Sequence, residues 1–210
     1  MRRTYYELTV PIKPGFALPD PATVNLKKNV IAGWLGLSLA DPKQWKEPPH
    51  VALANLGHER LNHAATIEQA CMFVKRHGLP MSDEQYKILG PGEPFEIAIR
   101  YFRAKQDQLR YAWERKDSKA LWFDSGLENL DLFYLPVTWA TGGLELQPAD
   151  CWTHLRLLLT RDLATKRARI CANSNCPAPY FIATRGNKIF CTHACANAVA
   201  QRNLRKRRAR

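Results

Sequence analysis

The clearest hydrophobic pattern along the chain begins after residue 64 and has the period of a helix. Its apolar face comprises Ile67, Ala70, Cys71 and Val74. Thr66 and Gln69 have the spacing of a capping box, and Gly78 and Pro80 carry the signals of a helix end. The pattern predicts a helix from about residue 66 to 77, in which Cys71 is a small buried hydrophobe and not a reactive thiol.

Two more helices follow from the same period. One is predicted from near Pro94 to about Lys116, with an inner side of Ile97, Tyr101, Leu109 and Ala112. The other opens at Pro148 to Asp150, where a proline and an acid suit the positive end of a helix. Its predicted buried face comprises Trp152, Leu155, Leu158, Leu159 and Leu163, with His154 as a core residue. We expect this helix to end in residues 166–169, so that no flexible linker precedes Cys171.

The other segments carry weaker patterns. Residues 1–60 hold many prolines, so long regular elements are not expected there, although Tyr5 to Val10 has the pattern of a short strand and residues 32–39 form an apolar patch. Residues 118–147 are rich in aromatic and β-branched residues with glycine turns, which predicts two or three short strands or a hairpin. The predicted fold class is mainly α with short β elements.

Charge separates the end of the chain from the rest. Of the 31 Lys and Arg residues, 12 lie in residues 161–210, where Asp162 is the only acid, so this part carries +11. Residues 1–160 hold the other 19 basic residues and 18 acids, a balance of +1. Such asymmetry indicates a polyanionic partner at one end of the molecule. There is no apolar run long enough to span a membrane and no apolar stretch after Met1-Arg2-Arg3, so we expect a cytoplasmic protein without a membrane partner.

Four cysteines at the basic end have the spacing C-x4-C-x14-C-x3-C. They are Cys171, Cys176, Cys191 and Cys195. Two close pairs of thiolates are what a tetrahedral zinc ion requires, and disulfides would need an oxidising compartment. The sequence therefore predicts one Zn²⁺ held by four sulfurs, with His193 as a bystander.

The segment between the two cysteine pairs is predicted to be a hairpin. Residues 180–183 and 188–190 have strand character, and Arg185 to Asn187 has turn chemistry. Thr192 stands where the N-cap of a helix belongs, so Cys195 falls in the first helical turn. Loop, hairpin and helix together predict a small treble-clef-like zinc module in residues 168–210, after a mostly helical domain in residues 1–167.

The C-terminal helix is expected to be the nucleic-acid contact. An apolar stripe of Ala196, Val199, Ala200 and Leu204 is predicted to pack on the hairpin. Arg202, Arg205 and Lys206 then project from the opposite face, where they can contact phosphates. Arg185, in the hairpin turn, is a fourth expected contact.

The two histidines in residues 58–63 are not expected to bind a metal. His58-Glu59-Arg60-Leu61-Asn62-His63 looks like the zinc-protease helix, but that motif needs histidines four residues apart. These are five apart and point in different directions on a helix. No catalytic metal is expected here.

Residues of the basic end resemble a known family, the CGNR zinc finger of bacterial proteins regarded as stress-induced transcriptional regulators. The resemblance covers roughly the last 40 residues and rests on Cys171, Cys176, Tyr180-Phe181, Arg185, Cys191, Cys195, Asn197 and the arginine-rich end. A weaker match around residues 65–79 resembles the helical ABATE domain that precedes this finger. The Cys-Gly-Asn-Arg signature stands here as Cys195-Ala196-Asn197-Ala198, so the signature arginine is replaced by Ala198.

Two functions are consistent with these residues. The resemblance and the charge imply a transcription regulator that binds duplex DNA through the zinc module and final helix. The alternative is an interaction module, in which zinc holds the fold and the basic tail binds RNA or an acidic protein. We do not expect an enzyme, because no nucleophile, base and orienting acid are paired in the sequence and four cysteine ligands leave zinc no open position.

Overall fold

The computed structural model describes residues 17–25, 28, 30–57, 66–80, 94–121, 137–140, 143–146, 148 and 150–209. In chain order the elements are β1 (Ala17–Asn25), β2 (Val30–Leu39), η1 (Pro42–Gln44), α1 (Pro49–Asn55), α2 (Ile67–His77), β3 (Pro94–Ala98), α4 (Ile99–Arg115), η2 (Ser118–Leu121), β4 (Val137–Ala140), β5 (Gly143–Leu146), α5 (Cys151–Ala164), β6 (Ala168–Ile170), β7 (Tyr180–Ile182) and α6 (His193–Arg208). The described part is helix-rich with small sheets, which confirms the predicted fold class at that level. The residues 5–10 expected as a strand and the pair His58 and His63 lie outside the described residues.

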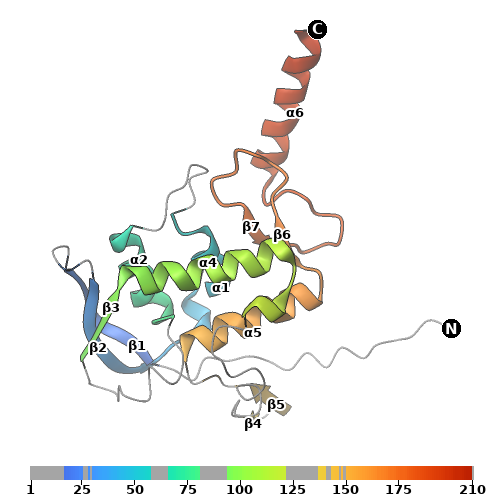
Figure 1. Ribbon diagram of the computed structural model, residues 1–210. Helices are drawn as coiled ribbons and strands as arrows, with labels where there is room; N and C mark the ends of the chain where they lie inside the picture. The colour runs from blue at the N-terminus through green and yellow to red at the C-terminus, as the bar shows by residue number, and fades with distance from the viewer. Residues whose placement is uncertain are drawn as a thin grey trace.

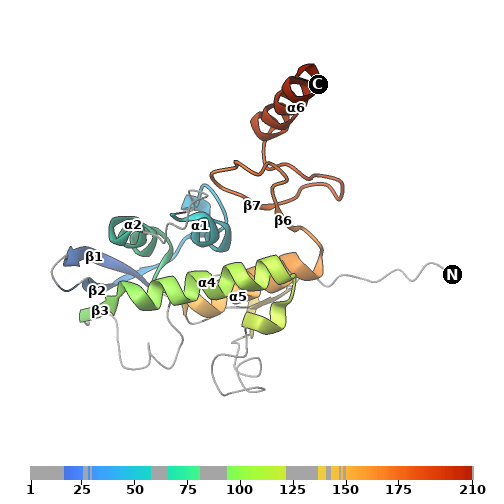
Figure 2. The ribbon, with the colours of Figure 1, turned by 45° about the horizontal axis from the view of Figure 1, so that its top comes forward.

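We call the described residues up to Arg167 the body and residues 168–209 the C-terminal module. The helices α4 and α5 run along the body, and the β1–β3 sheet lies at the end of the body away from α6 (Figure 1). In both views α6 projects outward from the module, while β6 and β7 lie next to the body (Figure 2). No helix in the described residues is long and apolar enough to cross a membrane.

The sheet of the body corrects the prediction that residues 1–60 lack long elements. β1 and β3 both pair antiparallel with β2, which lies between them, and Ile31 of β2 pairs with Ile97 of β3. The prolines are tolerated because Pro19 and Pro21 lie on an edge strand, where the register shifts on both sides of Pro19. An edge strand needs no N–H from proline on its outer side, so composition alone was misleading here.

The helix α2 forms as its sequence predicts. The Thr66 side chain accepts from the Gln69 amide, and the Gln69 side chain accepts in return from the Thr66 amide. Gly78 follows with a positive φ of 96° and ends the helix. The predicted apolar face is buried, and it includes Cys71.

The next helix begins later than predicted. Residues 94–98 form β3, because they pair with β2, and α4 starts only at Ile99. Ile97, Leu109 and Ala112 are buried, as predicted, but Tyr101, also expected inside, is 52% exposed. Phe102 and Trp113 are buried as well. Phe102 lies about 20° and Tyr101 about 80° from Leu109 around a helix, so Phe102 and not Tyr101 shares the inner side with Leu109.

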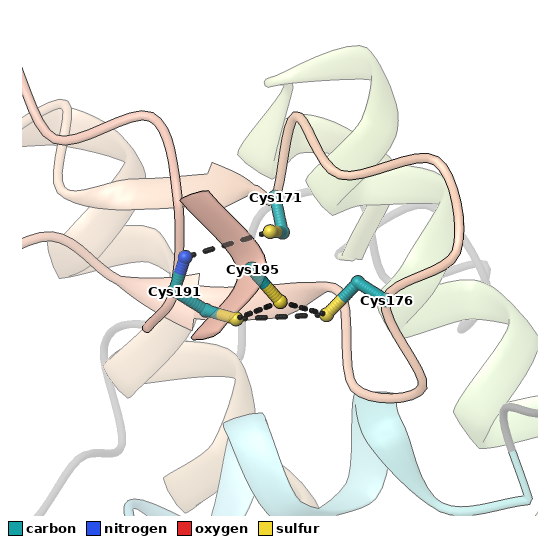
Figure 3. Close-up of side chains that lie close together, drawn as sticks. All are labelled: Cys171, Cys176, Cys191 and Cys195. Carbon is teal, nitrogen blue, oxygen red and sulfur yellow. Dashed lines mark hydrogen bonds between the residues drawn. The ribbon is translucent and has the colours of Figure 1, made fainter. Parts of the chain in front are cut away.

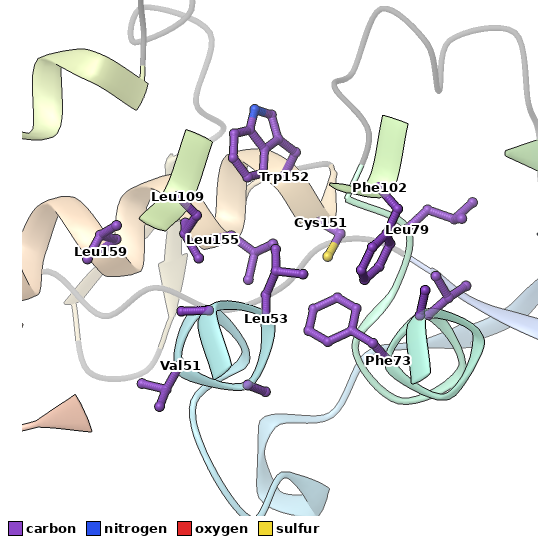
Figure 4. Packing of buried hydrophobic residues seen from close by; sticks show 14 of the residues in the cluster. Val51, Leu53, Phe73, Leu79, Phe102, Leu109, Cys151, Trp152, Leu155 and Leu159 are labelled. Carbon is purple, nitrogen blue, oxygen red and sulfur yellow. The ribbon is translucent and has the colours of Figure 1, made fainter. Parts of the chain in front are cut away.

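The main core lies between α1, α2, α4 and α5. Asp150 caps α5 by accepting from the Thr153 amide at 2.7 Å, as its position before the helix predicts. Figure 4 shows side chains of α5 such as Leu155 packed against Leu109 of α4 and Leu53 of α1. His154 is buried in this core, as expected. The prediction of a hairpin late in residues 118–147 is confirmed by β4 and β5, whereas residues 118–121 form the short helix η2.

Candidate metal centre

The first two cysteines lie at the ends of a tight loop. The Cys176 amide donates to the Asn173 carbonyl at 3.0 Å, and the Asn175 amide donates to the Asn173 side-chain oxygen at 3.2 Å. The Cys171 amide donates to the Pro179 carbonyl at 2.8 Å, which closes the base of the loop. This turn chemistry brings the Cys171 and Cys176 side chains to the same side of the loop.

The last two cysteines are positioned by the start of α6. Thr192 is the N-cap, and its hydroxyl accepts from the Cys195 amide at 3.3 Å. Cys195 therefore lies in the first turn, as predicted, and Cys191 immediately precedes the cap. The Cys191 amide donates to the Cys171 sulfur at 3.5 Å, which joins the two halves of the centre.

The four sulfurs converge on one point (Figure 3). The Sγ atom of Cys191 lies 3.5 Å from that of Cys176 and 3.5 Å from that of Cys195, and the Cys195 and Cys176 sulfurs are 3.7 Å apart. All four lie within 4.8 Å of one another. Sulfurs bound at about 2.3 Å to a tetrahedral zinc ion are about 3.8 Å apart, so the spacing fits a four-thiolate metal site.

The cysteines of this centre are largely buried, so their charged thiolate forms need a compensating cation. Cys171, Cys176 and Cys195 are buried and Cys191 is partly buried. Burial raises the pKa of the Cys176 and Cys191 thiols, because it disfavours their charged forms. A hydrogen bond from the Asn173 side chain instead lowers the pKa of the Cys195 thiol to about 6. A divalent cation would offset the desolvation of the thiolates and hold all four deprotonated.

The cluster that could hold a metal ion comprises the four predicted cysteines. Within the described residues this is the one cluster of three or more metal-binding side chains, and no histidine belongs to it. His193 is exposed on the first turn of α6 and lies outside this cluster. The fourteen residues between Cys176 and Cys191 carry no further member of the cluster.

The hairpin of the C-terminal module differs from the prediction. β7 pairs antiparallel with β6, and residues 188–190 form no strand. The segment Ala168–Ile170 was expected at the end of a helix, but α5 stops at Ala164 and Lys166 follows in a left-handed conformation with φ 57°. The chain thereby reverses before the first cysteine, which makes residues 168–170 available as the partner of β7.

The module docks on the body through contacts that the sequence did not indicate. The Asn55 side chain of α1 donates to the Tyr180 carbonyl at 2.8 Å and accepts from the Tyr180 amide at 3.0 Å. The Tyr180 hydroxyl donates to Glu114 of α4 at 2.6 Å, and the Trp113 indole donates to the Arg169 carbonyl at 3.1 Å. The expected boundary at residue 167 stays a prediction, and these contacts cross it.

The residues expected to contact nucleic acid lie in two places. Arg185 is exposed in the turn after β7, where its carbonyl accepts from the Lys188 amide at 3.1 Å. Arg205 and Lys206 are exposed on α6. Arg202 is not on the outer face as predicted: it is partly buried and donates to the Asn173 side-chain oxygen.

The packed face of α6 is accordingly not the predicted apolar stripe. Ala200 is exposed and Leu204 is 53% exposed, while Ala196 and Val199 are partly buried. From residue 203 to 209 every residue is exposed. The helix is therefore held over about its first three turns, up to Arg202, and projects free of the molecule beyond them (Figure 1).

Comparisons with known proteins give no match: no family model, no curated protein and no solved structure is similar to this chain. The resemblance to the CGNR finger therefore rests only on the residues named above.

Proposed function

We propose that this protein is a zinc-containing regulator of transcription that binds duplex DNA through α6. The observation that carries the proposal is the projecting basic helix. α6 contains Arg202, Arg205, Lys206, Arg207 and Arg208 and no acid. No acidic residue follows Asp162 in the chain, so the positive charge of the module is not compensated locally. A surface of this kind attracts polyanions.

The charge pattern of α6 also favours a bound state. Arg202 and Lys206 are four residues apart, and Arg205 and Arg208 are three apart, so like charges face each other along the helix. Each such pair destabilises an isolated helix by about 0.2–0.5 kcal/mol. Phosphates between the side chains would remove this repulsion. Binding would therefore stabilise the part of α6 that no other element covers.

The dimensions of α6 favour DNA over duplex RNA. Its 16 residues correspond to a length of about 24 Å at about 1.5 Å per residue. The major groove of B-form DNA is about 12 Å wide and admits a helix, whereas the major groove of A-form RNA is too narrow and deep. The exposed end of α6, residues 203–209, is about two turns long and can enter the first of these grooves and not the second.

Zinc would give this helix a fixed base. The ion at Cys171, Cys176, Cys191 and Cys195 has no open coordination position, so its role is structural. The thiolates lie at the N-terminus of α6 and the cations at its C-terminal end, and both placements suit the helix dipole. The module has only a small cluster of buried apolar residues, so the metal would supply much of its stability.

The test is fluorescence anisotropy on a labelled DNA duplex at several salt concentrations. The log of the affinity should fall with log salt by about 0.9 per phosphate contact. We expect the triple variant Arg202→Ala, Arg205→Ala and Lys206→Ala to lower this slope by about 0.9 for each phosphate contact that these side chains make, with unchanged zinc content. The matched control removes three exposed lysines of the body, Lys43, Lys46 and Lys119, and should keep the wild-type slope.

Competition decides between the partners. An unlabelled DNA duplex should displace the probe at lower concentration than an RNA duplex of the same length. Stronger displacement by RNA or by an acidic peptide would favour the interaction module instead. Equal salt slopes for wild type and the α6 triple variant would contradict the proposal.

A further inference from the structure

A pocket lies beside the metal centre, between the Cys171–Cys176 loop and the exposed side of α6. Its volume is about 270 Å³. The lining residues are Asn173, Asn175, Ala198, Gln201, Arg202 and Arg205. Five of these six side chains can donate hydrogen bonds, two of them are guanidinium groups, and none is acidic. This composition suits an oxyanion, and two guanidinium groups match the geometry of a phosphate.

One residue that lines the pocket, Asn173, is buried and held in place by hydrogen bonds. Asn173 is only 4% exposed. Its side-chain oxygen accepts from the Arg202 guanidinium and from the Asn175 amide, and its side-chain amide hydrogen-bonds the Cys195 thiol. One buried amide thus links a metal ligand to a cation of the pocket.

This linkage positions Arg202. An arginine on an exposed helix normally samples many rotamers and loses that freedom when it binds a ligand. A hydrogen bond to a buried acceptor fixes the guanidinium before the ligand arrives, so less entropy is lost on binding. Arg205 lies three residues further along the same helix and also lines the pocket.

We propose that this pocket is a binding site for one backbone phosphate of the nucleic acid, in which Asn173 is the positioning residue for Arg202. The inference rests on the proposed function, because it names the contact that would fix the register of α6 on the duplex. Arg202 and Arg205 bind the phosphate oxygens, and the amides of Asn175 and Gln201 donate to the same group. The bound metal keeps Asn173 in place through Cys195.

The first test fills the pocket without a change of charge. Ala198 and Ala200 are both exposed alanines of α6, but only Ala198 lines the pocket. We expect Ala198→Leu to reduce the salt slope of duplex binding by about 0.9, the contribution of one phosphate. Ala200→Leu makes the same substitution outside the pocket and should leave the slope unchanged, and both variants should keep their zinc.

The second test removes the positioning residue. Asn173→Ala should reduce the slope by about as much as Arg202→Ala, and the double variant should lose little more than either single one. Ser174→Ala, on the exposed part of the same loop, is the control. Additive losses in the double variant would show that Asn173 does not act through Arg202 and would overturn its assigned role.

Inorganic phosphate probes the pocket without nucleic acid. In a titration of the zinc-loaded, isotope-labelled full chain followed by NMR, the side-chain signals of Arg202 and Asn175 should shift, and sodium chloride of equal ionic strength should not reproduce this. Ala198→Leu should abolish the shifts. Duplex binding with no phosphate shifts and an unchanged slope in Ala198→Leu would overturn the pocket and leave the proposed function. Phosphate shifts without duplex binding would overturn the proposed function and leave a site for free phosphate; neither result would overturn both.

Discussion

Asn55 pairs with the main chain of Tyr180 as a neighbouring β-strand would. Its side-chain amide donates to the Tyr180 carbonyl at 2.8 Å, and its side-chain oxygen accepts from the Tyr180 amide at 3.0 Å. One side chain of α1 thus satisfies both backbone groups of a buried residue in β7. The helix α1 does this with a side chain, because the backbone groups within a helix are already hydrogen-bonded to one another.

Removal of this pair should weaken the docking of the C-terminal module. Asn55→Ala leaves the amide and carbonyl of Tyr180 without these partners in a partly buried place, so we expect the free energy of unfolding to fall by about 2 kcal/mol. Urea denaturation followed by tryptophan fluorescence measures the change. Asn203→Ala, an exposed site on α6, is the control and should be neutral. A neutral Asn55→Ala variant would mean that the module is held by its apolar contacts alone.

Metal content is the most direct test of the four-cysteine centre. We expect one zinc ion per chain by elemental analysis, and we expect its loss in Cys176→Ser, because three sulfurs bind zinc far more weakly than four. Cys71→Ser alters a buried cysteine of the body and should retain the zinc. Full zinc content in a Cys171→Ser, Cys195→Ser double variant would contradict the assignment. Chelation should unfold the module first and leave the helices of the body largely formed.

The body should become unstable in mild acid. Burial lowers the pKa of His77 to about 4 and that of His154 to about 3. Burial also lowers the pKa of His50, which is neutral and donates to the Asp162 carboxylate at 3.0 Å. The unfolded chain takes up protons on these three histidines below about pH 6.5, while their lowered pKa values disfavour protonation in the folded chain. The stability these groups contribute is therefore complete above pH 6.5 and falls as the pH drops, by about 2 kcal/mol each for His77 and His154 at pH 5.

Urea denaturation between pH 8 and pH 5 measures this dependence. His77 lies between the rings of Phe73 and Trp45, so His77→Phe should fit the site and make the loss of stability on acidification shallower. His193→Gln, at an exposed position, should leave the pH dependence unchanged. A wild-type stability that is flat from pH 8 to pH 5 would show that the buried histidines take up protons in the folded chain.

Two glycines should respond in opposite ways to alanine. An added Cβ at Gly186 would meet no atom within 4 Å. Gly186→Ala should therefore raise the free energy of unfolding slightly, by about 0.4–1 kcal/mol, because it restricts the unfolded chain. Gly78→Ala should destabilise, since φ is 96° at that position. Thermal unfolding of both variants measures the two effects, and a loss of stability in Gly186→Ala would indicate a contact at this turn that the structure does not contain.

The parts of the fold that the sequence predicted are those with local causes. The capping box of Thr66 and Gln69, the cap at Asp150 and the cap at Thr192 each involve residues three apart, so their geometry follows from the chain alone. The cysteine ligands follow for a similar reason, because a turn or a helix start brings each close pair together. Local chemistry of this kind is visible before any tertiary contact is known.

The errors arise where a distant partner decides. Residues 168–170 form a strand only because β7 lies beside them, and β1 accepts prolines only because it is an edge. The prediction for Arg202 was wrong for another reason. It assumed that the apolar residues of α6 face inward, but Arg202 of α6 instead contacts the polar side chain of Asn173. The polarity of a partner surface cannot be inferred from the period of the helix that packs on it.

Consecutive residues of β7 belong to different cores. Tyr180 packs in the large core of the body, and Phe181 packs in the small cluster around the cysteines. The alternation of a strand makes this possible, since neighbouring side chains point to opposite faces. The module therefore cannot be transferred alone to another protein, because Tyr180 and Ala168 would then form an exposed apolar face. A chimaera that retains a folded metal centre would have to include α1 and α4 as well.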